Sequence, residues 1–370
     1  MASFQKRNKT WQYQVSRMVN GEQKPIRKGG FRTKKEAQVA AAQIESDLHK
    51  GINPFLTPEP FVNYFEGWVK IYKTDISNFT KKRYKDSLRA IESYFGYRPI
   101  QNIKKREYQD FLNTFAKTWA KETTRKLHNH IRACVREAID EGLVRVDFTR
   151  DAVVTGNNQP KRPEEKHLNY TDSCKLMKGL YKRLDRSLSF YLLLLALTSG
   201  MRFGELVGLT RDDFDFNNNL LHVKRTWDYK DGSGFSTTKN NSSERVILID
   251  QDTMNVFKDL FEETPPNLHD LVFFSPYNKS NVLTNAAVNK SLRIILDELG
   301  IRHITVHGLR HTHASILLYK GISIYFVSER LGHRTIDTTM RHYAHVLNEL
   351  RAKDTLNTVM TFTEMKKGLG

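Results

Sequence analysis

The second half of the chain holds side chains whose types suit chemistry on a phosphodiester. Two guanidiniums can clamp the non-bridging oxygens of a phosphate and stabilise the extra negative charge of a pentacoordinate transition state. A tyrosine can attack phosphorus and keep the bond energy as a phosphotyrosyl ester, while lysine and histidine can transfer protons. The side chains in question follow each other in the order Arg202, Lys239, His307, Arg310, His333 and Tyr343.

The first arginine of this set follows a long apolar run. Gly200 ends the helix that this run predicts, and Arg202 and Glu205 lie three positions apart on the next one. At that spacing Glu205 can hold Arg202 in position. Taken alone, such a pair is more often structural than catalytic, so it gains meaning only from the downstream residues.

The lysine of the set lies in a strand-rich insert. Two strands are predicted there, Leu220–Thr226 and Arg245–Ile249, with turn residues between them. Lys224, Lys230 and Lys239 all lie in this insert. From the residues alone, all three remain candidates for the lysine of the set.

The remaining groups come from the last seventy residues. His307 and Arg310 lie on one face of a predicted helix in the string HGLRHTHAS, His333 follows in LGH, and Tyr343 comes ten residues later in HYAH. Two nearby tyrosines are expected in the core because their helical stretches are apolar: Tyr319 and Tyr325.

The histidines and cysteines of the sequence do not match a familiar metal-site pattern. Six of the 13 histidines lie between residues 307 and 345, but no Asp, Glu or Cys joins them at familiar ligand spacings. The two cysteines, Cys134 and Cys174, are too few for a disulfide framework or a cysteine-rich metal site. We therefore expect no metal and no other cofactor.

Composition points to a polyanionic partner. The 370 residues include 59 Lys and Arg against 41 Asp and Glu, a net charge of +18, which favours nucleic acid over an acidic membrane surface. The longest apolar run, Phe190 to Leu197, is far shorter than the roughly 20 residues of a membrane span. With no signal peptide visible, we expect a soluble, intracellular, multidomain protein without membrane association.

The basic excess is densest at the N-terminus. Residues 1–57 hold eleven basic and four acidic side chains and predict a small domain: a three-stranded sheet with a hairpin turn at Asn20-Gly21, then a helix that begins with a capping box of Thr33 and Glu36. Such a sheet could enter a DNA major groove, although the charges could also merely solubilise the domain. Its candidate DNA contacts are Lys6, Arg7, Lys9, Arg17, Lys24, Arg27 and Lys28.

Residues 58–155 predict an all-helical domain after a proline-rich linker. Four helices are expected, with Thr80 and Thr123 as caps of the second and fourth: 61–74, 81–94, 104–115 and 121–139. The basic run Lys81, Lys82 and Arg83 is a candidate DNA contact, although a single run of this kind is more often a solvated helix face. A second linker, 155–166, precedes a mostly helical domain at 165–370.

In order and spacing, the phosphodiester-directed set resembles the tyrosine recombinases of the phage integrase family. SGMRFGEL, HGLRHTHAS, LGH and HYAH look like its signature strings. The N-terminal module is similar to the arm-binding domains of integrases from Gram-positive phages and conjugative transposons. The resemblance implies a multidomain α+β fold with a small N-terminal β-sheet plus helix, an all-helical, SAM-like core-binding domain, and a mostly helical catalytic domain with a small β-sheet.

The resemblance also implies an activity. Tyr343 would form a 3′-phosphotyrosyl link to DNA and release a 5′-hydroxyl, without metal or ATP. The two arginines would bind the scissile phosphate, the two histidines would hydrogen-bond it or assist proton transfer, and Lys239 would be the general acid on the leaving oxygen. The expected function is site-specific recombination that integrates and excises a prophage or an integrative conjugative element.

The same resemblance implies partners. These are double-stranded DNA with core and arm attachment sites, a homotetramer that exchanges strands through a Holliday junction, a DNA-bending protein and an excisionase, all in the cytoplasm of a bacterial host. Residues 347–365 would dock on a neighbouring protomer or form a frayed tail. Two other functions remain in play: a monomeric type IB topoisomerase, and a DNA-binding regulator that kept the fold without the chemistry.

Overall fold

The computed structural model describes residues 2–19, 22–49, 58–157, 163–230, 232–237 and 244–367. The chain divides into two compact units, Met1–Pro160 and Lys161–Gly370. The predicted turn at Asn20-Gly21, most of the first predicted linker and Lys239 lie outside the described residues. Within the described residues, no helix has the length and apolarity needed to cross a membrane.

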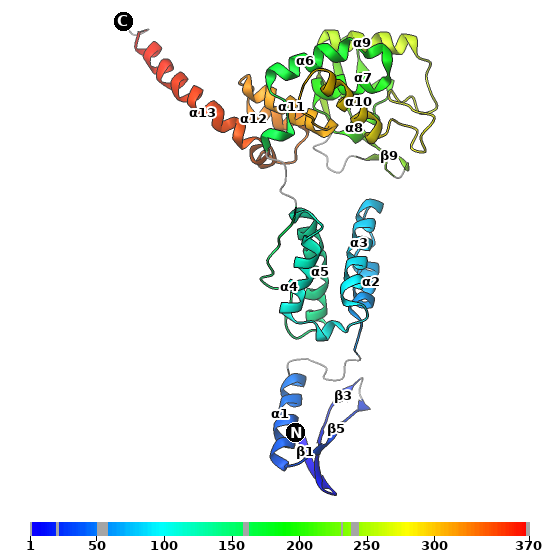
Figure 1. Cartoon of the computed structure of the whole chain (residues 1–370), viewed down its shortest axis with the longest axis vertical. Coiled ribbons are helices and arrows are strands. Elements are labelled where there is room, and N and C mark those ends of the chain that lie inside the picture. The colour runs from blue at the N-terminus through cyan, green and yellow to red at the C-terminus, as the bar shows by residue number, and fades with distance from the viewer. Residues whose placement is uncertain are drawn as a thin grey trace. The chain divides into compact units, whose positions relative to one another are not determined.

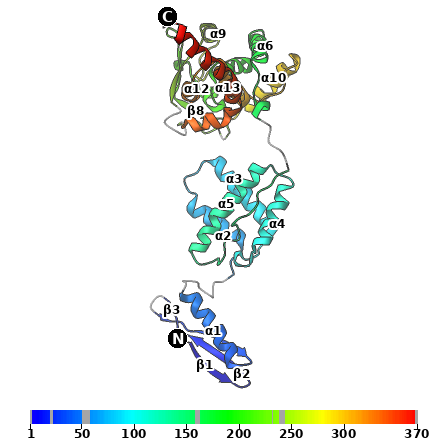
Figure 2. The same cartoon turned by 90° about the vertical axis from the view of Figure 1, so that its left-hand side faces the viewer.

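The N-terminal part of the first unit is a small antiparallel sheet covered by one helix, as predicted. Helix α1 (Lys34–His49) packs on one face of the sheet (Figure 2) around Tyr13, Val15, Ile26 and Ala41. The Glu36 amide donates to Thr33 Oγ1 at 3.2 Å, but the Glu36 carboxylate accepts from the Arg32 amide, so only half of the predicted capping box forms. The sheet has the order β1 (Ala2–Arg7), β2 (Thr10–Val15), β5 (Ile26–Phe31), with a short pair β3 (Met18–Val19) and β4 (Glu22–Gln23) beside it.

The rest of the first unit is a helical bundle (Figure 1). Its core is rich in aromatic rings, among them Phe61, Phe65, Trp68 and Phe111, and it also encloses Cys134. Its helices are α2 (Phe61–Tyr72), α3 (Asn78–Phe95), α4 (Lys105–Ala116) and α5 (Lys121–Asp140), with a 3₁₀ turn η1 (Ile100–Asn102) between the two pairs.

The two predicted caps of this bundle are wrong. Ser77 caps α3, because its hydroxyl oxygen accepts from the Thr80 amide at 3.3 Å, and Thr80 itself lies inside the helix. The residue before α5 is Ala120, and Thr123 lies in the first turn of that helix. Both helices therefore begin about one turn earlier than a threonine cap would place them.

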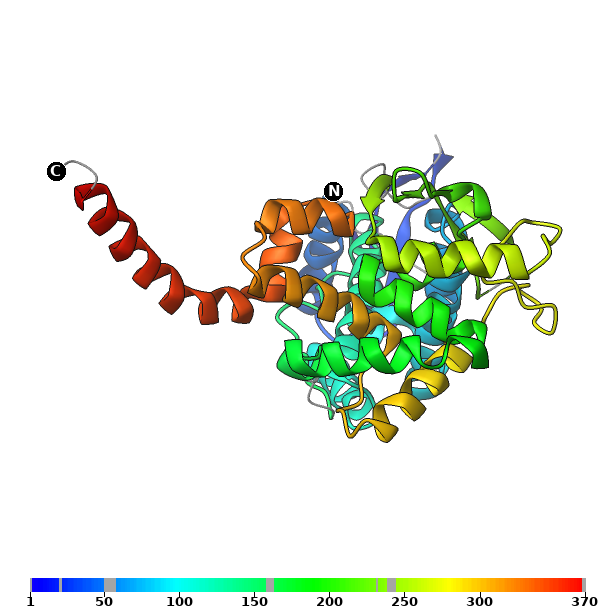
Figure 3. The same ribbon diagram turned by 90° about the horizontal axis from the view of Figure 1, so that it is seen from above.

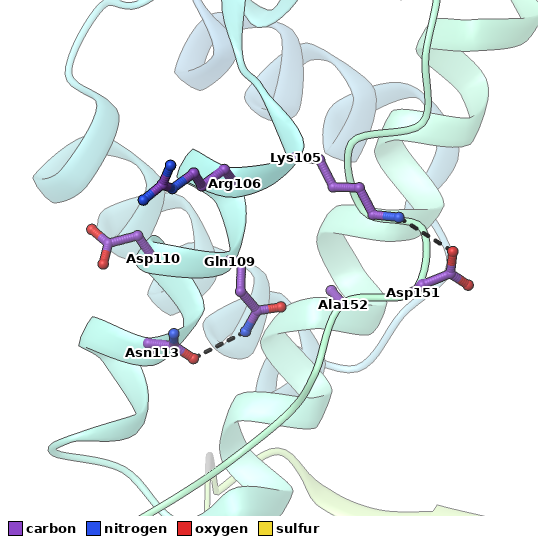
Figure 4. Close-up of a pocket in the computed structure, with 7 residues that line it drawn as sticks. All are labelled: Lys105, Arg106, Gln109, Asp110, Asn113, Asp151 and Ala152. Atoms are coloured by element: carbon purple, nitrogen blue, oxygen red, sulfur yellow. Dashed lines mark hydrogen bonds and ion pairs between the residues drawn. The ribbon is translucent and has the colours of Figure 1, made fainter.

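A polar depression lies between α4 and the segment that leaves the bundle (Figure 4). The Gln109 side chain holds that segment at both backbone groups of Val153, donating to its oxygen at 2.9 Å and accepting from its amide at 2.8 Å. Lys105 pairs with Asp151 at 3.2 Å across the depression. Because Lys105 and Arg106 are matched in number by Asp110 and Asp151, the lining of this depression has no net charge with which to attract an anion.

The second unit is built around α7 (Leu188–Ser199), which is buried on all sides and packs against α11 (Val306–Tyr319). Two small antiparallel sheets lie beside these helices, one of β6 (Phe214–Asp215), β7 (Leu220–Val223) and β10 (Arg245–Leu248), the other of β8 (Arg225–Asp228) and β9 (Gly234–Thr237). The other helices are α6 (Tyr170–Tyr181), α8 (Phe203–Val207), α9 (Gln251–Glu263), α10 (Asn285–Glu298), α12 (Ile324–Leu331) and α13 (Ile336–Lys367), with 3₁₀ turns η2 (Pro163–Lys166), η3 (Leu184–Arg186) and η4 (Arg211–Asp213).

Helix α13 leaves this core after its first turns, and in Figure 3 its C-terminal part projects away from the helices around it. Large apolar side chains in that part are exposed, including Val359, Met360, Phe362 and Met365. The C-terminal part of α13 is therefore helical and carries exposed apolar side chains.

The prediction that Tyr319 and Tyr325 are core residues is wrong. Their side chains are 54% and 74% exposed. Tyr319 ends α11 and stacks on Tyr170, while Tyr325 lies in the first turn of α12. Apolar neighbours in sequence do not bury a ring at a helix end, where the chain turns into solvent.

Candidate active site

Two helix ends supply carbonyl oxygens to the two arginines of the candidate site. Helix α7 ends at Gly200, with φ of 69°, and α12 ends at Gly332, with φ of 64°, a left-handed conformation that glycine adopts without strain. The Gly200 oxygen accepts from Arg310 Nη1 at 2.8 Å, and the Gly332 oxygen accepts from Arg202 Nη2 at 3.1 Å. Because helix C-termini carry partial negative charge, both ends favour a guanidinium.

Arg310 is almost fully buried, with 3% of its surface exposed. Besides Gly200, the Leu331 oxygen accepts from its Nη2 at 2.7 Å. Burial, and then the charge of Arg202, lowers the pKa of Arg310 to about 9, so the group remains cationic at neutral pH. Within the described residues these two carbonyls are its hydrogen-bond partners, so no described residue accepts from the other three of its five N–H donors.

Arg202 is held by a buried carboxylate and still reaches solvent. Its Nη1 donates to Glu205 Oε1 at 2.7 Å, as predicted, and its side chain is 40% exposed. Glu205 Oε2 accepts from Arg245 Nη2 at 2.9 Å. Burial alone would raise the pKa of the Glu205 carboxyl, but Arg245 and then Arg202 outweigh it and hold that pKa below its ordinary value.

A further layer of hydrogen bonds fixes Arg245 itself. Its Nε donates to the Arg330 oxygen at 2.7 Å, and the Arg330 Nε donates to His313 Nε2 at 3.1 Å. His313 must then carry its proton on Nδ1, which donates to the Leu197 oxygen at 2.9 Å. Burial lowers the pKa of His313 to about 3, so this histidine is a neutral structural link.

The two histidines of the predicted set lie beside the arginines. The His333 Nδ1 is 2.7 Å from Thr339 Oγ1, and burial followed by the charges of Arg310 and Arg202 lowers the pKa of His333 to about 3. The same causes, in the same order, lower the pKa of His307, part of whose ring reaches solvent. Both rings are neutral hydrogen-bonding groups in the absence of a bound anion.

Tyr343 lies at a kink. Its φ of −119° and ψ of 16° interrupt α13, and its side chain is 2% exposed. The hydroxyl oxygen lies 2.9 Å from Nδ1 of His311. Burial raises the pKa of Tyr343 even though the charge of Arg310 acts to lower it, so the resting side chain is a protonated phenol close to a cation.

The described part of the chain therefore brings together five of the six residues predicted to do chemistry, and Lys239 lies outside it. Of the alternative lysines, Lys224 pairs with the buried carboxylate of Asp213 at 3.5 Å. Sequence reasoning missed His311 and Arg245. The sequence did contain a signal for His311, because it lies four positions after His307 and such positions share a helix face. In the structure the centres of the two rings are 4.9 Å apart.

The predicted DNA contacts of the N-terminal sheet lie on its surface. Strand alternation turns Tyr13 and Val15 toward α1 and turns Gln14 and Arg27 to the opposite face, where Arg27 Nε donates to Gln14 Oε1 at 2.8 Å. The same alternation in β1 places Arg7 on that face. Exposed or half-buried side chains are found for the whole set Lys6, Arg7, Lys9, Arg17, Lys24, Arg27 and Lys28.

The basic run of the bundle lies on α3. Lys81 and Lys82 are exposed, and the Arg83 guanidinium lies over the Phe79 ring at 4.5 Å. Burial, followed by the charges of Arg83, Lys73 and Lys126, lowers the pKa of nearby His130 to about 4. Lys73 at the end of α2, Arg83 on α3 and Lys126 on α5 thus place positive charge around His130. The sequence analysis did not predict Lys73 and Lys126.

Comparison with known families agrees with this geometry. The phage integrase family matches residues 166–349, an N-terminal SAM-like domain of phage integrases matches 61–116, and an arm DNA-binding domain matches 3–48. The chain belongs to the phage integrase family. As a member it is a tyrosine recombinase, an enzyme that cleaves and rejoins DNA.

Curated relatives of this recombinase span most of its length. The integrase of Staphylococcus phage L54a is 26% identical over 280 residues, which cover 68% of this chain and 78% of the relative. A tyrosine recombinase XerC-like protein of Caldanaerobacter subterraneus is 26% identical over 374 residues, which cover 93% and 94%.

Solved structures share the fold. The integrase of transposon Tn1549, in complex with a circular intermediate DNA, has a TM-score of 0.66 at 18% identity and covers 80% of this chain and 99% of that one. A lambda integrase tetramer bound to a Holliday junction has a TM-score of 0.56 at 18% identity, with 87% and 89% covered. The predicted multidomain α+β fold, mostly helical with small antiparallel sheets, is confirmed.

Proposed function

We propose that Tyr343 is the nucleophile and that the groups around it form one phosphodiester-cleaving site. The observation that carries this proposal is the convergence of two arginines, two neutral histidines and the kinked tyrosine from α8, α11, α12 and α13. Tyr343 Oη attacks phosphorus, an Oη–P bond forms, and the bond from phosphorus to the 5′ oxygen breaks. The product is a 3′-phosphotyrosyl ester with a free 5′-hydroxyl on the other strand end.

The two arginines hold the phosphate. Arg202 reaches solvent and Arg310 keeps N–H donors that no described residue takes, so both can donate to non-bridging oxygens. Their carbonyl partners fix the guanidinium planes before DNA arrives, which spares the reaction the reorganisation of these charges. His307 and His333 add neutral hydrogen bonds at the same phosphate.

Lys239 is proposed as the general acid on the leaving 5′ oxygen. It follows β9 by two residues, and β10 begins at Arg245, which pairs with the carboxylate that holds Arg202. Strand β10, which follows Lys239 in sequence, pairs with β7, and its first residue lies beside Arg202 through the shared Glu205 carboxylate. The pairing of Lys224 with Asp213 supports Lys239 over that alternative.

DNA is gripped by three parts with different tasks. We assign 1–57 to arm sites, 58–155 to the duplex around the cleavage point, and 165–370 to core-site binding and chemistry. The exposed basic side chains of the sheet and the positive cluster around Arg83 and His130 support the first two assignments. Phosphate contacts of this kind position a protein on DNA without reading its sequence.

The proposed biological task is integration and excision of a prophage or an integrative element in the cytoplasm of a bacterial host. Relatives from a phage and structural likeness to a transposon integrase support it. Four protomers would exchange strands at two sites, with the exposed apolar side chains of α13 docking on neighbours. A DNA-bending protein and an excisionase complete the proposed set of partners.

The nucleophile is tested by replacing only its hydroxyl. Tyr343→Phe should abolish covalent protein–DNA adducts on a nicked suicide substrate and leave DNA binding intact, because the ring still fills its buried site. Tyr325→Phe is the matched control, since that tyrosine is exposed on α12, and it should form adducts at the wild-type rate.

Adducts that persist in Tyr343→Phe would refute the assignment. Incubation of the wild-type protein with paired attachment-like sites separates the two enzymatic alternatives: recombinant products are expected, whereas supercoil relaxation without any recombinant product would favour a topoisomerase. Specific binding with no adduct on any substrate would favour a regulator.

A further inference from the structure

The hydroxyl of Tyr343 has a partner that the motif residues do not include. His311 directly follows Arg310 on α11, and its ring is half-buried with Nδ1 at 2.9 Å from the Tyr343 oxygen. Among the described residues, this nitrogen is the hydrogen-bond partner of that hydroxyl. His307, one turn earlier on the same helix, meets the edge of the His311 ring and makes no described hydrogen bond to the tyrosine.

The direction of this hydrogen bond follows from protonation. The buried phenol is protonated at neutral pH, because burial raises the pKa of Tyr343, and a buried O–H proton needs an acceptor. His311 is neutral, since burial lowers its pKa to about 3, and a neutral imidazole can present an unprotonated nitrogen. The phenol therefore donates to Nδ1, and the His311 ring carries its own proton on Nε2.

We propose that His311 is the general base that takes the proton of Tyr343 during strand cleavage. This inference rests on the proposed role of Tyr343 as the nucleophile. A general base must lie within hydrogen-bond reach of the proton that it removes, and His311 already does so in the protein without DNA.

Strand cleavage with His311 as the base conserves protons and electrons at each step. As the Tyr343 oxygen bonds to phosphorus, its proton moves to His311 Nδ1, and the bond from phosphorus to the 5′ oxygen breaks with its electron pair on that oxygen. The 5′ oxygen takes a proton from the general acid, proposed as Lys239. In rejoining, the 5′-hydroxyl attacks, the acid recovers its proton, and His311 returns the proton to the departing phenol.

The charges around His311 explain why the base is idle without DNA. On α11 it faces His307 and Arg310, on α13 it faces His342, and on η2 it faces Lys166; all of these act with burial to disfavour the imidazolium. A phosphate bound by the two arginines brings the opposite charge to the same place. The imidazolium then becomes less costly at the moment when the phosphorane develops its extra negative charge.

The test compares a base with an equally placed acceptor that cannot be protonated. In His311→Asn the amide oxygen can accept from the Tyr343 hydroxyl but cannot remove its proton. We expect adduct formation on a nicked suicide substrate to fall by about 100-fold or more, with DNA binding and the unfolding transition unchanged. His303→Asn is the matched control, because that exposed ring pairs with the exposed Asp297 side chain and has no part in the proposed step, and it should cleave at the wild-type rate.

One further substrate and one modified nucleophile identify which proton transfer has been lost. A 5′-bridging phosphorothiolate supplies a leaving group that needs no general acid, so it should not restore cleavage by His311→Asn. A fluorotyrosine at position 343 lowers the pKa of the phenol and should restore it in part. If His311→Asn fails to fold, His311→Gln is measured in the same three assays.

Cleavage by a folded His311 variant within about twofold of wild type would overturn the inference, as would its rescue by the phosphorothiolate, which would place the histidine on the leaving-group side. Failure of the proposed nucleophile is a separate outcome. Adducts formed by Tyr343→Phe would remove Tyr343 itself, whereas normal adducts from His311→Asn beside none from Tyr343→Phe would remove only the role of His311.

Discussion

A single buried carboxylate organises the cationic side of the site. Glu205 is 1% exposed and pairs with both Arg202 and Arg245. A buried ion that loses one partner is left undercompensated, and this costs far more than the pair contributes when intact. The position of Arg202, the arginine proposed to bind phosphate, thus depends on Arg245.

Arg245→Met tests this dependence at the residue scale. The change should lower the free energy of unfolding by about 3 to 5 kcal/mol at neutral pH, and Arg202 should lose its fixed position. Chemical denaturation measures the loss of stability. Adduct formation on a nicked suicide substrate measures the effect of the displaced Arg202 on cleavage. A double variant that also carries Glu205→Gln should recover much of the stability but not the cleavage rate; equal recovery of both would make Arg245 a merely structural residue.

The same variant has a defined pH dependence. Arg245 is the main cause that lowers the pKa of Glu205 in the folded protein, and a depressed carboxyl pKa stabilises the fold above the unfolded pKa of about 4.3 and ceases to do so as pH falls through the folded value. The stability difference between wild type and Arg245→Met should therefore be largest near pH 7 and shrink on acidification. A difference that stays constant as pH falls from 7 to well below about 4.3 would rule out Glu205 as its source.

The residues proposed for the reaction are easier to recognise in the sequence than the residues that support them. Arg202, His307, Arg310, His333 and Tyr343 are marked by residue type and by spacing within short strings. Arg245 reaches Glu205 from forty positions away, and no local pattern announces such a contact. The exposure of Tyr319 and Tyr325 was missed for a related reason, because an apolar run does not show on which side a helix ends.

At the scale of elements, the site is assembled from helix termini. The last carbonyls of α7 and α12 accept from the two arginines, and both ends require a glycine with positive φ. Gly200 has a second constraint, because a Cβ there would lie 2.6 Å from Cδ2 of His313. The glycine thus fixes a helix end, a histidine and an arginine at once.

Gly200→Ala should therefore lower the free energy of unfolding by more than backbone strain alone would. A left-handed alanine costs about 1 to 2 kcal/mol, and the contact with His313 must also be relieved by movement of the α7 end that holds Arg310. We expect a larger loss of unfolding free energy than strain alone gives, together with slower cleavage.

Gly321→Ala provides the matched comparison. Gly321 has φ of 84° and nothing within 4 Å of an added Cβ, so that variant should lose about 1 to 2 kcal/mol and keep the wild-type cleavage rate. Equal effects of the two substitutions on stability and cleavage would contradict the role given to the α7 terminus.

Element existence and type were predictable, while element starts were less so. The four helices of the bundle and the sheet-plus-helix module follow from periodicity and turn residues, and both are present. Caps were misplaced because Ser77 and Thr80 are equally good candidates in sequence, and only the fold decides which oxygen accepts the amide. Likewise, Ala120 precedes α5 with no side chain able to cap it.

At the scale of the whole molecule, the +18 charge is divided unevenly. Residues 1–57 hold eleven of the 59 basic side chains against four acidic ones, whereas the catalytic part is nearly balanced. The proposed division of tasks therefore predicts that affinity for DNA and chemistry on DNA can be separated in this chain. Positive charge on the N-terminal module should raise occupancy of arm sites without entering the reaction.

Deletion of residues 1–57 should abolish high-affinity binding to arm-site duplexes and leave adduct formation on isolated core sites largely intact. The fall of log affinity with log salt should also become shallower, by a slope of about 0.9 for each phosphate contact removed. Loss of core-site cleavage with unchanged arm binding would contradict the division of labour.

A second experiment keeps the full chain and removes two positive charges from the N-terminal module, either from its sheet face or from its helix. Arg7 and Arg27 lie on the sheet face opposite α1, whereas Lys34 and Lys35 lie exposed at the start of that helix. Because both double substitutions to Gln remove the same charge, a nonspecific attraction would weaken equally in the two. We expect arm binding, measured by titration at fixed salt, to fall much further for Arg7→Gln/Arg27→Gln; equal losses would show that the module acts by charge alone and not through a sheet face laid on DNA.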